Sequence, residues 1–155
     1  RSPRCQTCPV ADVCGARAQA RVLDYPRKTR ALRRSARESV WLWIAHRGRV
    51  LLVQRPAQGI WASLWSLPEW PSFDALGNAT RGWPGRGEAL PSVLHVLTHL
   101  DWTLHPRRWT LPDAADPRPL VQPLIGDAAA VCWVTPREAL ALGLPVPWRR
   151  LFEGV

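Results

Sequence analysis

Three cysteines near the start of the sequence carry its clearest chemical signal. Cys5, Cys8 and Cys14 follow the spacing Cys-x2-Cys-x5-Cys. Two thiolates separated by two residues can hold one metal ion or cluster from a single tight turn, and a third thiolate nearby extends the site. Disulfides are rare in cytosolic proteins, so we do not expect these cysteines to pair with one another. The alternatives are an iron–sulfur cluster, a structural zinc ion with a distant fourth ligand, and no metal at all. Cys132 lies within the apolar run Ala-Val-Cys-Trp-Val, where we expect it to be a small buried hydrophobic residue.

The composition is that of a basic globular chain, long enough for one compact domain. Hydrophobic residues make up 46% and charged residues 21% of the 155 positions, so the chain can bury a core and is not expected to be disordered. No apolar run approaches the roughly 20 residues of a membrane helix. The first residues, Arg-Ser-Pro-Arg-Cys-Gln-Thr-Cys, lack the apolar region of a signal peptide. We therefore expect a bacterial cytoplasmic protein, with no membrane partner.

The charge of the chain suggests a polyanionic partner. The net charge is +9, and all but one of the 21 basic residues are arginine, Lys28 being the exception. A basic protein attracts nucleic acid above other partners. An arginine-rich composition also follows from a GC-rich genome, so the charge indicates DNA without establishing it.

Three segments differ in composition. Residues 1–20 contain three of the four cysteines, and residues 21–38 carry seven basic side chains with almost no apolar periodicity. This pattern is typical of a basic interdomain linker, which could either lie along a phosphate backbone or be a solvated connector. Residues 39–155 form the domain proper.

Within this domain the pattern changes to short strands, followed by two helices. Apolar residues on both alternating faces of residues 40–45 indicate a central strand covered on both sides, which a tight turn joins to a second strand. Strands are expected at residues 40–45, 50–55, 64–69, 92–98, 101–105, 108–111 and 130–134, with Pro106 as a bulge or edge and residues 71–91 as a loop. A capping box at Thr135 predicts a helix that ends at Gly143, and a second helix begins at Pro147. The expected fold class is α+β, a mixed β-sheet sandwiched by helices.

At this point the sequence resembles a known family. Cys5, Cys8 and Cys14, with Pro9 after the second cysteine, are similar to the last three ligands of the Cys-x6-Cys-x2-Cys-x5-Cys loop of MutY and endonuclease III glycosylases. The resemblance implies that residues 1–20 are the end of a 4Fe–4S loop. The first ligand would lie before Arg1, so we expect the cluster in the parent protein and not in this fragment.

The resemblance continues into residues 39–155. The segment Arg49-Val-Leu-Leu-Val-Gln-Arg-Pro56, followed by Gly59-Ile-Trp61 and Leu64-Trp65-Ser-Leu-Pro68, resembles the opening of the Nudix-like C-terminal domain of MutY. The succession of both motifs, joined by a short basic linker, covers nearly the whole chain. A Nudix-like fold also raises nucleotide hydrolysis as an alternative. That reaction needs several carboxylates on one helix face to hold Mg²⁺, whereas the acids of residues 59–90 are scattered (Glu69, Asp74 and Glu88).

The resemblance implies instead a role in DNA base excision repair. The family removes adenine mispaired with 8-oxoguanine, and a Phe-Ser-His loop of this domain inspects the damaged base. Leu97, Thr98 and His99 match that loop, with Leu97 in place of the phenylalanine. Thr98 keeps a hydroxyl that can accept a hydrogen bond from N7–H, which 8-oxoguanine has and guanine lacks.

The same resemblance places the catalytic Glu and Asp in a helical N-terminal domain before Arg1, so the fragment itself is expected to be non-catalytic. The expected partners are duplex DNA containing 8-oxoguanine:adenine pairs and the catalytic domain of the same protein. Binding to DNA would associate the protein with the nucleoid, and the protein is expected to be a monomer.

Arg55 is expected to be structural, either pairing with Glu69 or contacting a phosphate. Most tryptophans, Trp61 and Trp65 included, are expected to be core residues. A zinc-containing nucleic-acid module and a protein-interaction domain remain as other function classes.

Overall fold

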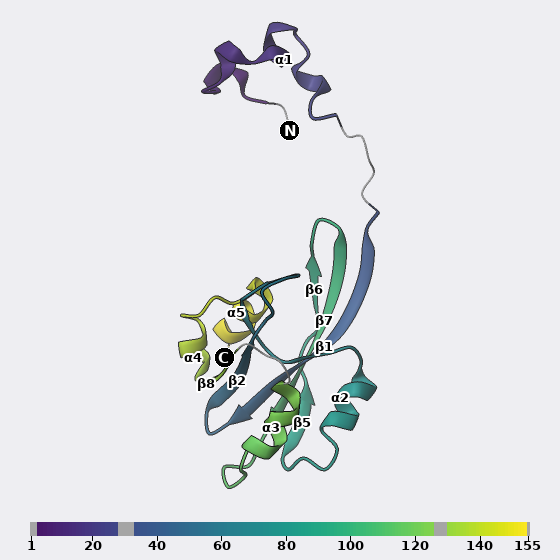
Figure 1. Cartoon of the computed structure of the whole chain (residues 1–155), viewed down its shortest axis with the longest axis vertical. Coiled ribbons are helices and arrows are strands. Elements are labelled where there is room, and N and C mark those ends of the chain that lie inside the picture. Colours follow the sequence, from purple (N-terminus) through teal and green to yellow (C-terminus); the bar gives the residue numbers. More distant parts are fainter. Residues whose placement is uncertain (1–2, 28–32, 126–129, 155) are drawn as a thin grey trace. The chain divides into compact units, whose positions relative to one another are not determined.

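The chain forms two compact units, residues 1–33 and 34–155. The computed structural model describes residues 3–27, 33–125 and 130–154 (Figure 1); residues 28–32 of the predicted linker therefore lie outside the described part. The described residues of the first unit form short helical turns: Cys5–Thr7, Ala11–Val13 and Val22–Asp24 are 3-10 turns, and α1 spans Gly15–Ala18. The cysteine motif is carried by these turns and the residues that join them.

In the second unit, the residues that the structure describes form one eight-stranded mixed sheet. Its strands are β1 (Ser35–His46), β2 (Arg49–Gln54), β3 (Trp65–Ser66), β4 (Glu69–Trp70), β5 (Arg86–Ala89), β6 (Val93–Val96), β7 (Leu100–Thr110) and β8 (Val131–Val134). The main order is β3-β2-β1-β7-β5, while β4 pairs with β1, β6 with β7 and β8 with β2. All pairs are antiparallel except that of β1 and β7.

The two longest strands, β1 and β7, pair in parallel at the centre of the sheet. It runs in register from Ser35 opposite Leu100 to Ala45 opposite Thr110. β1 then turns back into β2 through Arg47 and Gly48, which both have positive φ. A two-residue hairpin turn of type I′ requires positive φ at both of its central residues, so the tight turn predicted from the sequence is confirmed.

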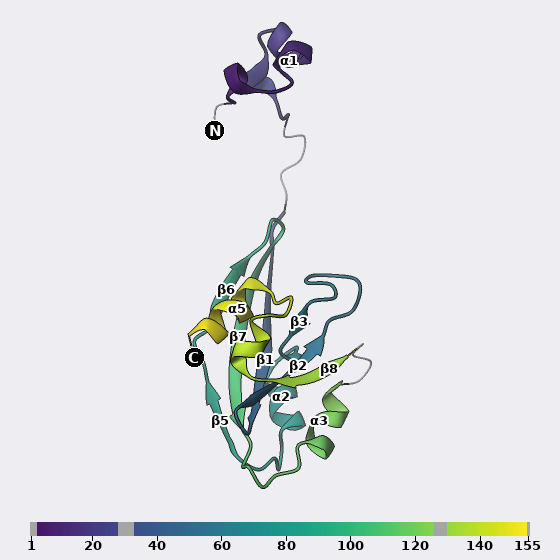
Figure 2. The same cartoon turned by 90° about the vertical axis from the view of Figure 1, so that its left-hand side faces the viewer.

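Helices cover both faces of the sheet, as Figure 2 shows. They are α2 (Phe73–Ala79), α3 (Arg118–Ile125), α4 (Pro136–Ala139) and α5 (Val146–Glu153). Alternate residues of β1 enter two separate cores. Trp41, Trp43 and Ala45 pack in the core that includes residues of α4 and α5, whereas Val40, Leu42 and Ile44 pack in the core that includes residues of α2 and α3. The predicted α+β sandwich with a doubly covered central strand is therefore confirmed.

A cluster of tryptophans fills the first of these cores. Trp41 lies 4.9 Å from Trp148 and 5.6 Å from Trp102, measured between ring centroids. All three rings are fully buried, and each indole N–H donates to a buried serine: Trp41 and Trp102 to Ser39 Oγ at 2.7 and 2.8 Å, and Trp148 to Ser66 Oγ at 2.9 Å. Trp61 and Trp65 are half-buried and pack against the same core, in agreement with the core role expected for them.

Several elements differ from the sequence-based expectation. β1 begins at Ser35, so residues 35–38, assigned to the linker, form its first part through pairing with β7. The segment 71–91, expected to be a loop, contains α2 and β5, and α3 was not expected. β7 continues through Pro106, which lies between the residues that pair with β6 (to Leu104) and those that pair with β5 (from Arg107). The missing N–H of Pro106 therefore costs no antiparallel hydrogen bond at this point.

Both helices near the end of the chain lie where they were expected; the first is shorter than predicted, and α5 begins at Val146, one residue before the predicted start. The capping box is present: Thr135 Oγ1 accepts from Glu138 N at 3.2 Å, and Glu138 Oε2 accepts from Thr135 N at 2.8 Å. The helix that it starts, α4, ends already at Ala139. In the described part of the chain, no helix has both the length and the apolar character that a bilayer crossing would need.

Candidate functional site

The three residues matched to the recognition loop lie together in the turn between β6 and β7 (Figure 1). Leu97 N donates to Leu100 O at 2.8 Å, which closes the turn. Leu97 is half-buried and packs against the tryptophan-rich core, whereas Thr98 and His99 are exposed. The structure thus places a hydroxyl and an imidazole at the tip of a hairpin and uses the apolar side chain to anchor it.

Arg34 and Ser35, immediately before and at the start of β1, form hydrogen bonds to this turn. Ser35 N donates to His99 O at 3.0 Å, and Ser35 Oγ donates to the same oxygen at 3.3 Å. Arg34 Nη1 donates to Thr98 O at 3.3 Å, and its Nε and Nη2 both donate to the Asp101 carboxylate, the Nε contact measuring 3.2 Å. The guanidinium hydrogen bonds lower the pKa of Asp101, and the pKa of Arg34 is correspondingly raised. Sequence reasoning placed Arg34 in the linker and missed these contacts, which join residues 64 to 67 positions apart.

A layer of aromatic rings packs together beside the hairpin of β6 and β7. Trp61 stacks on Trp102 with 4.9 Å between ring centroids and 21° between planes, and His95 of β6 lies 5.1 Å from Trp61. The Arg37 guanidinium lies 4.4 Å from the centroid of Trp102, a cation–π contact. Burial lowers the pKa of His95, so this imidazole is neutral at pH 7 and packs as an aromatic ring.

Glu69 joins two arginines beside this layer. It accepts from Arg55 Nη1 at 3.0 Å and from Arg37 Nη2 at 2.5 Å. Its side chain and that of Arg55 are each 17% exposed, so this pair is largely shielded from solvent, whereas the side chain of Arg37 is 46% exposed. The expected pairing of Arg55 with Glu69 is confirmed. Both oxygens of the Glu69 carboxylate are occupied by cations of the protein itself.

The remaining acids of this region do not complete a cation site. Asp74 lies in the first turn of α2, and Glu88 lies on β5. Within residues 3–27, 33–125 and 130–154, no three metal-ligating side chains are gathered into a group. The described part of the chain therefore does not assemble the carboxylate cluster that a nucleotide hydrolase would use to hold Mg²⁺.

The cysteine motif supplies suitable donors, but within the described residues 3–27 its three thiols are not gathered into a group that could hold a metal. Cys5, Cys8 and Cys14 are half-buried free thiols. Thiolates are the ligands of iron–sulfur clusters, and a 4Fe–4S cluster takes four of them; the motif supplies three. Cys132 lies on β8, half-buried against the tryptophan-rich core, and burial raises the pKa of its thiol. It behaves as the apolar residue that the sequence predicts.

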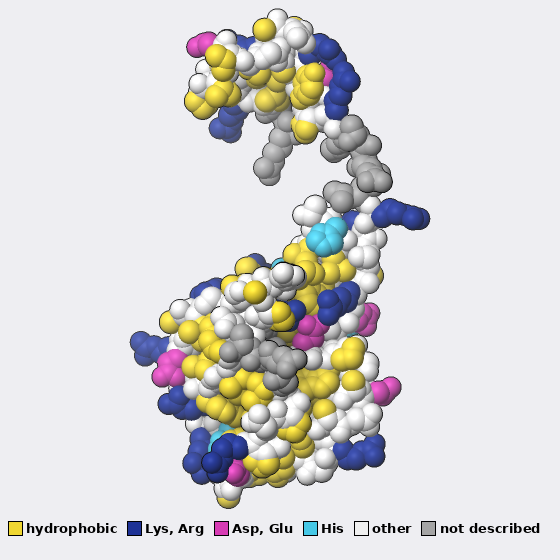
Figure 3. All heavy atoms as spheres, in the orientation of Figure 1, with side chains coloured by type: hydrophobic (Ala, Val, Ile, Leu, Met, Phe, Trp, Pro, Cys, Tyr) yellow, Lys and Arg dark blue, Asp and Glu magenta, His cyan; other side chains and the backbone are white. Residues whose placement is uncertain are grey.

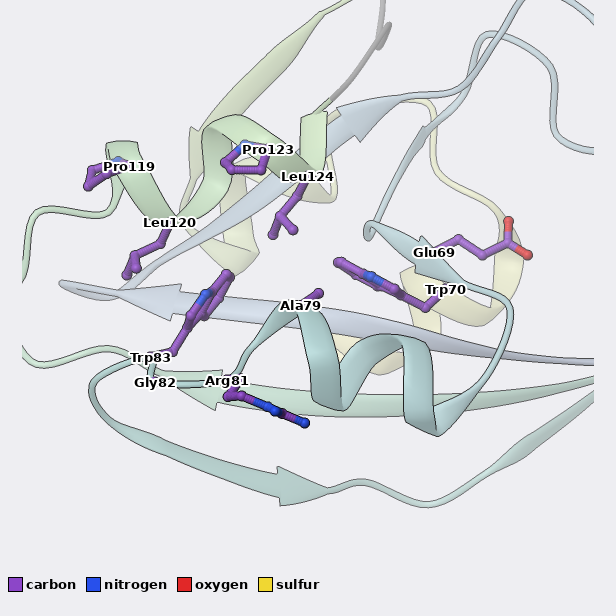
Figure 4. A pocket seen from close by; sticks show the side chains of 10 residues that line it. All are labelled: Glu69, Trp70, Ala79, Arg81, Gly82, Trp83, Pro119, Leu120, Pro123 and Leu124. Atoms are coloured by element: carbon purple, nitrogen blue, oxygen red, sulfur yellow. The ribbon is translucent and has the colours of Figure 1, made fainter.

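A cavity of about 490 Å³ lies away from the hairpin, between α2 and α3 (Figure 4). Trp70, Trp83 and Leu124 point toward it, whereas the carboxylate of Glu69 is turned away. Its lining includes none of the residues expected to bind DNA or metal. The sequence-predicted recognition residues and the cavity therefore belong to different parts of the sheet.

The chain belongs to the NUDIX domain family, whose model matches residues 39–154. A second family model, described as the iron-sulfur binding domain of endonuclease III, matches residues 1–14. The two matches follow one another in the order that the MutY resemblance predicts.

Several solved structures have a similar fold over most of this chain. The C-terminal domain of mouse MUTYH, crystallised with human PCNA, has a TM-score of 0.55 and 22% identity, and the match covers 75% of this chain and 84% of that one. The MutT protein of Methanosarcina mazei Go1 has a TM-score of 0.57 and 20% identity, covering 80% and 95%. The NUDIX domain of Shewanella oneidensis NrtR, crystallised with ADP ribose, has a TM-score of 0.58 and 18% identity, covering 87% and 94%. At these identities the likeness establishes a Nudix fold.

Proposed function

We propose that the chain is the lesion-recognition portion of a MutY-type adenine DNA glycosylase, which removes adenine mispaired with 8-oxoguanine. The observation that carries this proposal is the presence, in one chain, of an endonuclease III iron–sulfur motif followed by a NUDIX domain. A nucleotide hydrolase has no use for the first motif. The structural likeness to the C-terminal domain of mouse MUTYH supports the same conclusion.

The β6–β7 turn is the proposed reader of the damaged base. 8-Oxoguanine carries a hydrogen on N7, where guanine presents an acceptor. The exposed Thr98 hydroxyl can accept from that hydrogen, and the adjacent His99 imidazole can bind a phosphate or orient the hydroxyl. Leu97 supports both by packing inward. A hydroxyl can also donate, so discrimination depends on how firmly the turn is held.

Hydrolysis of the glycosidic bond is assigned to residues outside these 155. The target adenine must be rotated out of the duplex before its bond can be broken, and unstacking costs a few kcal/mol. A turn that grips 8-oxoguanine offsets part of that cost only when the damaged base is present. This chain would therefore supply selectivity, while the general acid and the group that stabilises the sugar cation belong to the catalytic domain.

The other proposed properties follow from the same assignment. Cys5, Cys8 and Cys14, with a fourth thiolate from the rest of the protein, would hold a 4Fe–4S cluster whose chemistry here is structural. The partners would be duplex DNA with 8-oxoguanine:adenine pairs and the catalytic domain of the same protein, which would act as a monomer at the bacterial nucleoid. On the face seen in Figure 3, the basic side chains of residues 34–155 are scattered around the edge and not gathered into one patch.

Nucleotide hydrolysis is the competing function for a Nudix fold, and the arrangement of the carboxylates does not support it. Glu69 is engaged by Arg37 and Arg55, and no carboxylate cluster is formed by the residues that the structure describes. The MutT protein and NrtR share the fold, but fold alone does not transfer an activity.

The proposal is tested by the double variant Thr98→Ala/His99→Ala in the complete protein. Its preference for 8-oxoguanine:adenine over guanine:adenine duplexes should fall by about 1–3 kcal/mol, the value of one lost base contact. Thr110→Ala is the matched control, because Thr110 is an exposed threonine at the other end of β7. Wild-type preference in the double variant would show that the turn does not read the base.

A further inference from the structure

The turn at residues 97–99 is held by more contacts than a hairpin needs. The Leu97 N to Leu100 O hydrogen bond already closes it. In addition, Ser35 donates twice to His99 O, and Arg34 donates to Thr98 O and to both oxygens of Asp101. The carbonyls of both exposed residues of the turn therefore accept hydrogen bonds from Arg34 and Ser35, while the side chains of Thr98 and His99 are exposed.

Stability of the domain does not explain the arginine. The side chains of Arg34 and Asp101 are each 41% exposed, and ion pairs at such positions contribute little to folding because water screens them. The geometry of the contact is what distinguishes it. A guanidinium is a planar fork with fixed donors, so binding Asp101 with two of its nitrogens sets the direction in which Nη1 approaches Thr98 O.

We infer that Arg34 is a positioning residue for base recognition, which fixes the peptide between Thr98 and His99 through Asp101 and so holds the two recognition side chains in one orientation. This inference rests on the proposed function of the turn. A hydroxyl that can both donate and accept separates N7–H from a bare N7 only if its orientation is fixed, and a recognition site that its neighbours hold too loosely loses the geometry it needs. Arg34 also begins the second unit, so the contact ties the end of the linker segment to the turn.

The first test compares four single variants of the complete protein: Arg34→Ala, Arg34→Lys, Asp101→Asn and the control Arg33→Ala. Arg33 is an exposed arginine one position earlier that makes none of these contacts, so its removal deletes the same charge. Affinities are measured for duplexes with 8-oxoguanine or guanine opposite adenine. The ratio of the two affinities should fall about threefold to tenfold in Arg34→Ala. It should fall also in Arg34→Lys, which keeps the charge without the fork, and in Asp101→Asn. Arg33→Ala should weaken both affinities equally and leave the ratio unchanged.

The second test reads the turn without DNA. Amide hydrogen exchange is followed at residues 97–100 in the 155-residue chain, together with the thermal unfolding midpoint. Arg34→Ala should speed exchange in the turn while leaving the midpoint within about 2 °C of wild type. The inference is overturned if Arg34→Ala and Arg33→Ala give the same affinity ratio in a protein whose wild type discriminates, or if exchange in the turn does not change. If the wild-type protein does not discriminate at all, the proposed function fails, and the exchange data alone then decide whether Arg34 orders the turn.

Discussion

Ser39 offers the sharpest test of how the tryptophan-rich core is held together. Its hydroxyl, on a side chain only 1% exposed, accepts from the indole N–H groups of both Trp41 and Trp102. Ser39→Ala would leave two buried donors without an acceptor, and each such donor costs about 1–3 kcal/mol. We therefore expect the free energy of unfolding to fall by about 2–6 kcal/mol, a large part of the 5–15 kcal/mol typical of a domain.

Ser66 provides the matched comparison. It is equally buried and accepts from one indole, that of Trp148, so Ser66→Ala should cost about half as much, about 1–3 kcal/mol. Urea unfolding of the 155-residue chain, followed by tryptophan fluorescence, measures both variants; the midpoint should shift while the slope stays that of wild type. In a double-mutant cycle, Trp148→Phe should remove most of the Ser66→Ala penalty, because no orphaned donor remains. If Ser39→Ala cost no more than Ser66→Ala, the account based on two donors would be wrong.

Two further predictions concern a titrating ring and the cysteines. Burial lowers the pKa of His95 in the folded chain, so the unfolded chain binds a proton at this ring more readily. The contribution of the neutral ring to folding stability is therefore complete above the unfolded pKa of about 6.5 and declines as the pH falls below it. Between pH 7.5 and 5.5, the urea midpoint should fall more in wild type than in His95→Gln. A wild type and variant with parallel pH profiles would contradict this. After anaerobic reconstitution of the complete protein, the Cys8→Ala variant should bind much less iron than wild type. The Cys132→Ala variant should bind as much as wild type, because Cys132 packs against the core. Equal iron contents in the two variants would refute the ligand assignment.

Local sequence patterns predicted the elements whose signals are local. The doubly apolar run of β1, the two-residue turn at Arg47 and Gly48, and the capping box at Thr135 all depend on neighbouring residues, and all three are present. β5 could not be predicted this way, because all four of its residues are exposed. Its pairing with β7 defines it, and Gly87 is needed there since a Cβ would lie 2.8 Å from the ring of Trp109. α3 was hidden by Pro123 within the helix, a residue that normally argues against one.

The same limit applies to the candidate site. Thr98 and His99 could be singled out because the family resemblance names them, and Arg55 because it lies at the end of a predicted strand. Arg34 could not, since its partner Asp101 is 67 positions away and is brought close only by the parallel pairing of β1 with β7. In the sequence, nothing distinguishes Arg34 from the other arginines of the basic segment. Contacts that depend on the pairing of distant strands produce no periodic pattern by which the sequence could predict them.

The central claim is that the hairpin tip senses oxidation of a purine. The most direct measurement is an equilibrium titration of the complete wild-type protein with two duplexes that differ only in whether 8-oxoguanine or guanine lies opposite adenine, at one salt concentration, because phosphate contacts make both affinities salt-dependent. We predict tighter binding to the duplex with 8-oxoguanine. Equal affinity for the two duplexes would contradict the claim.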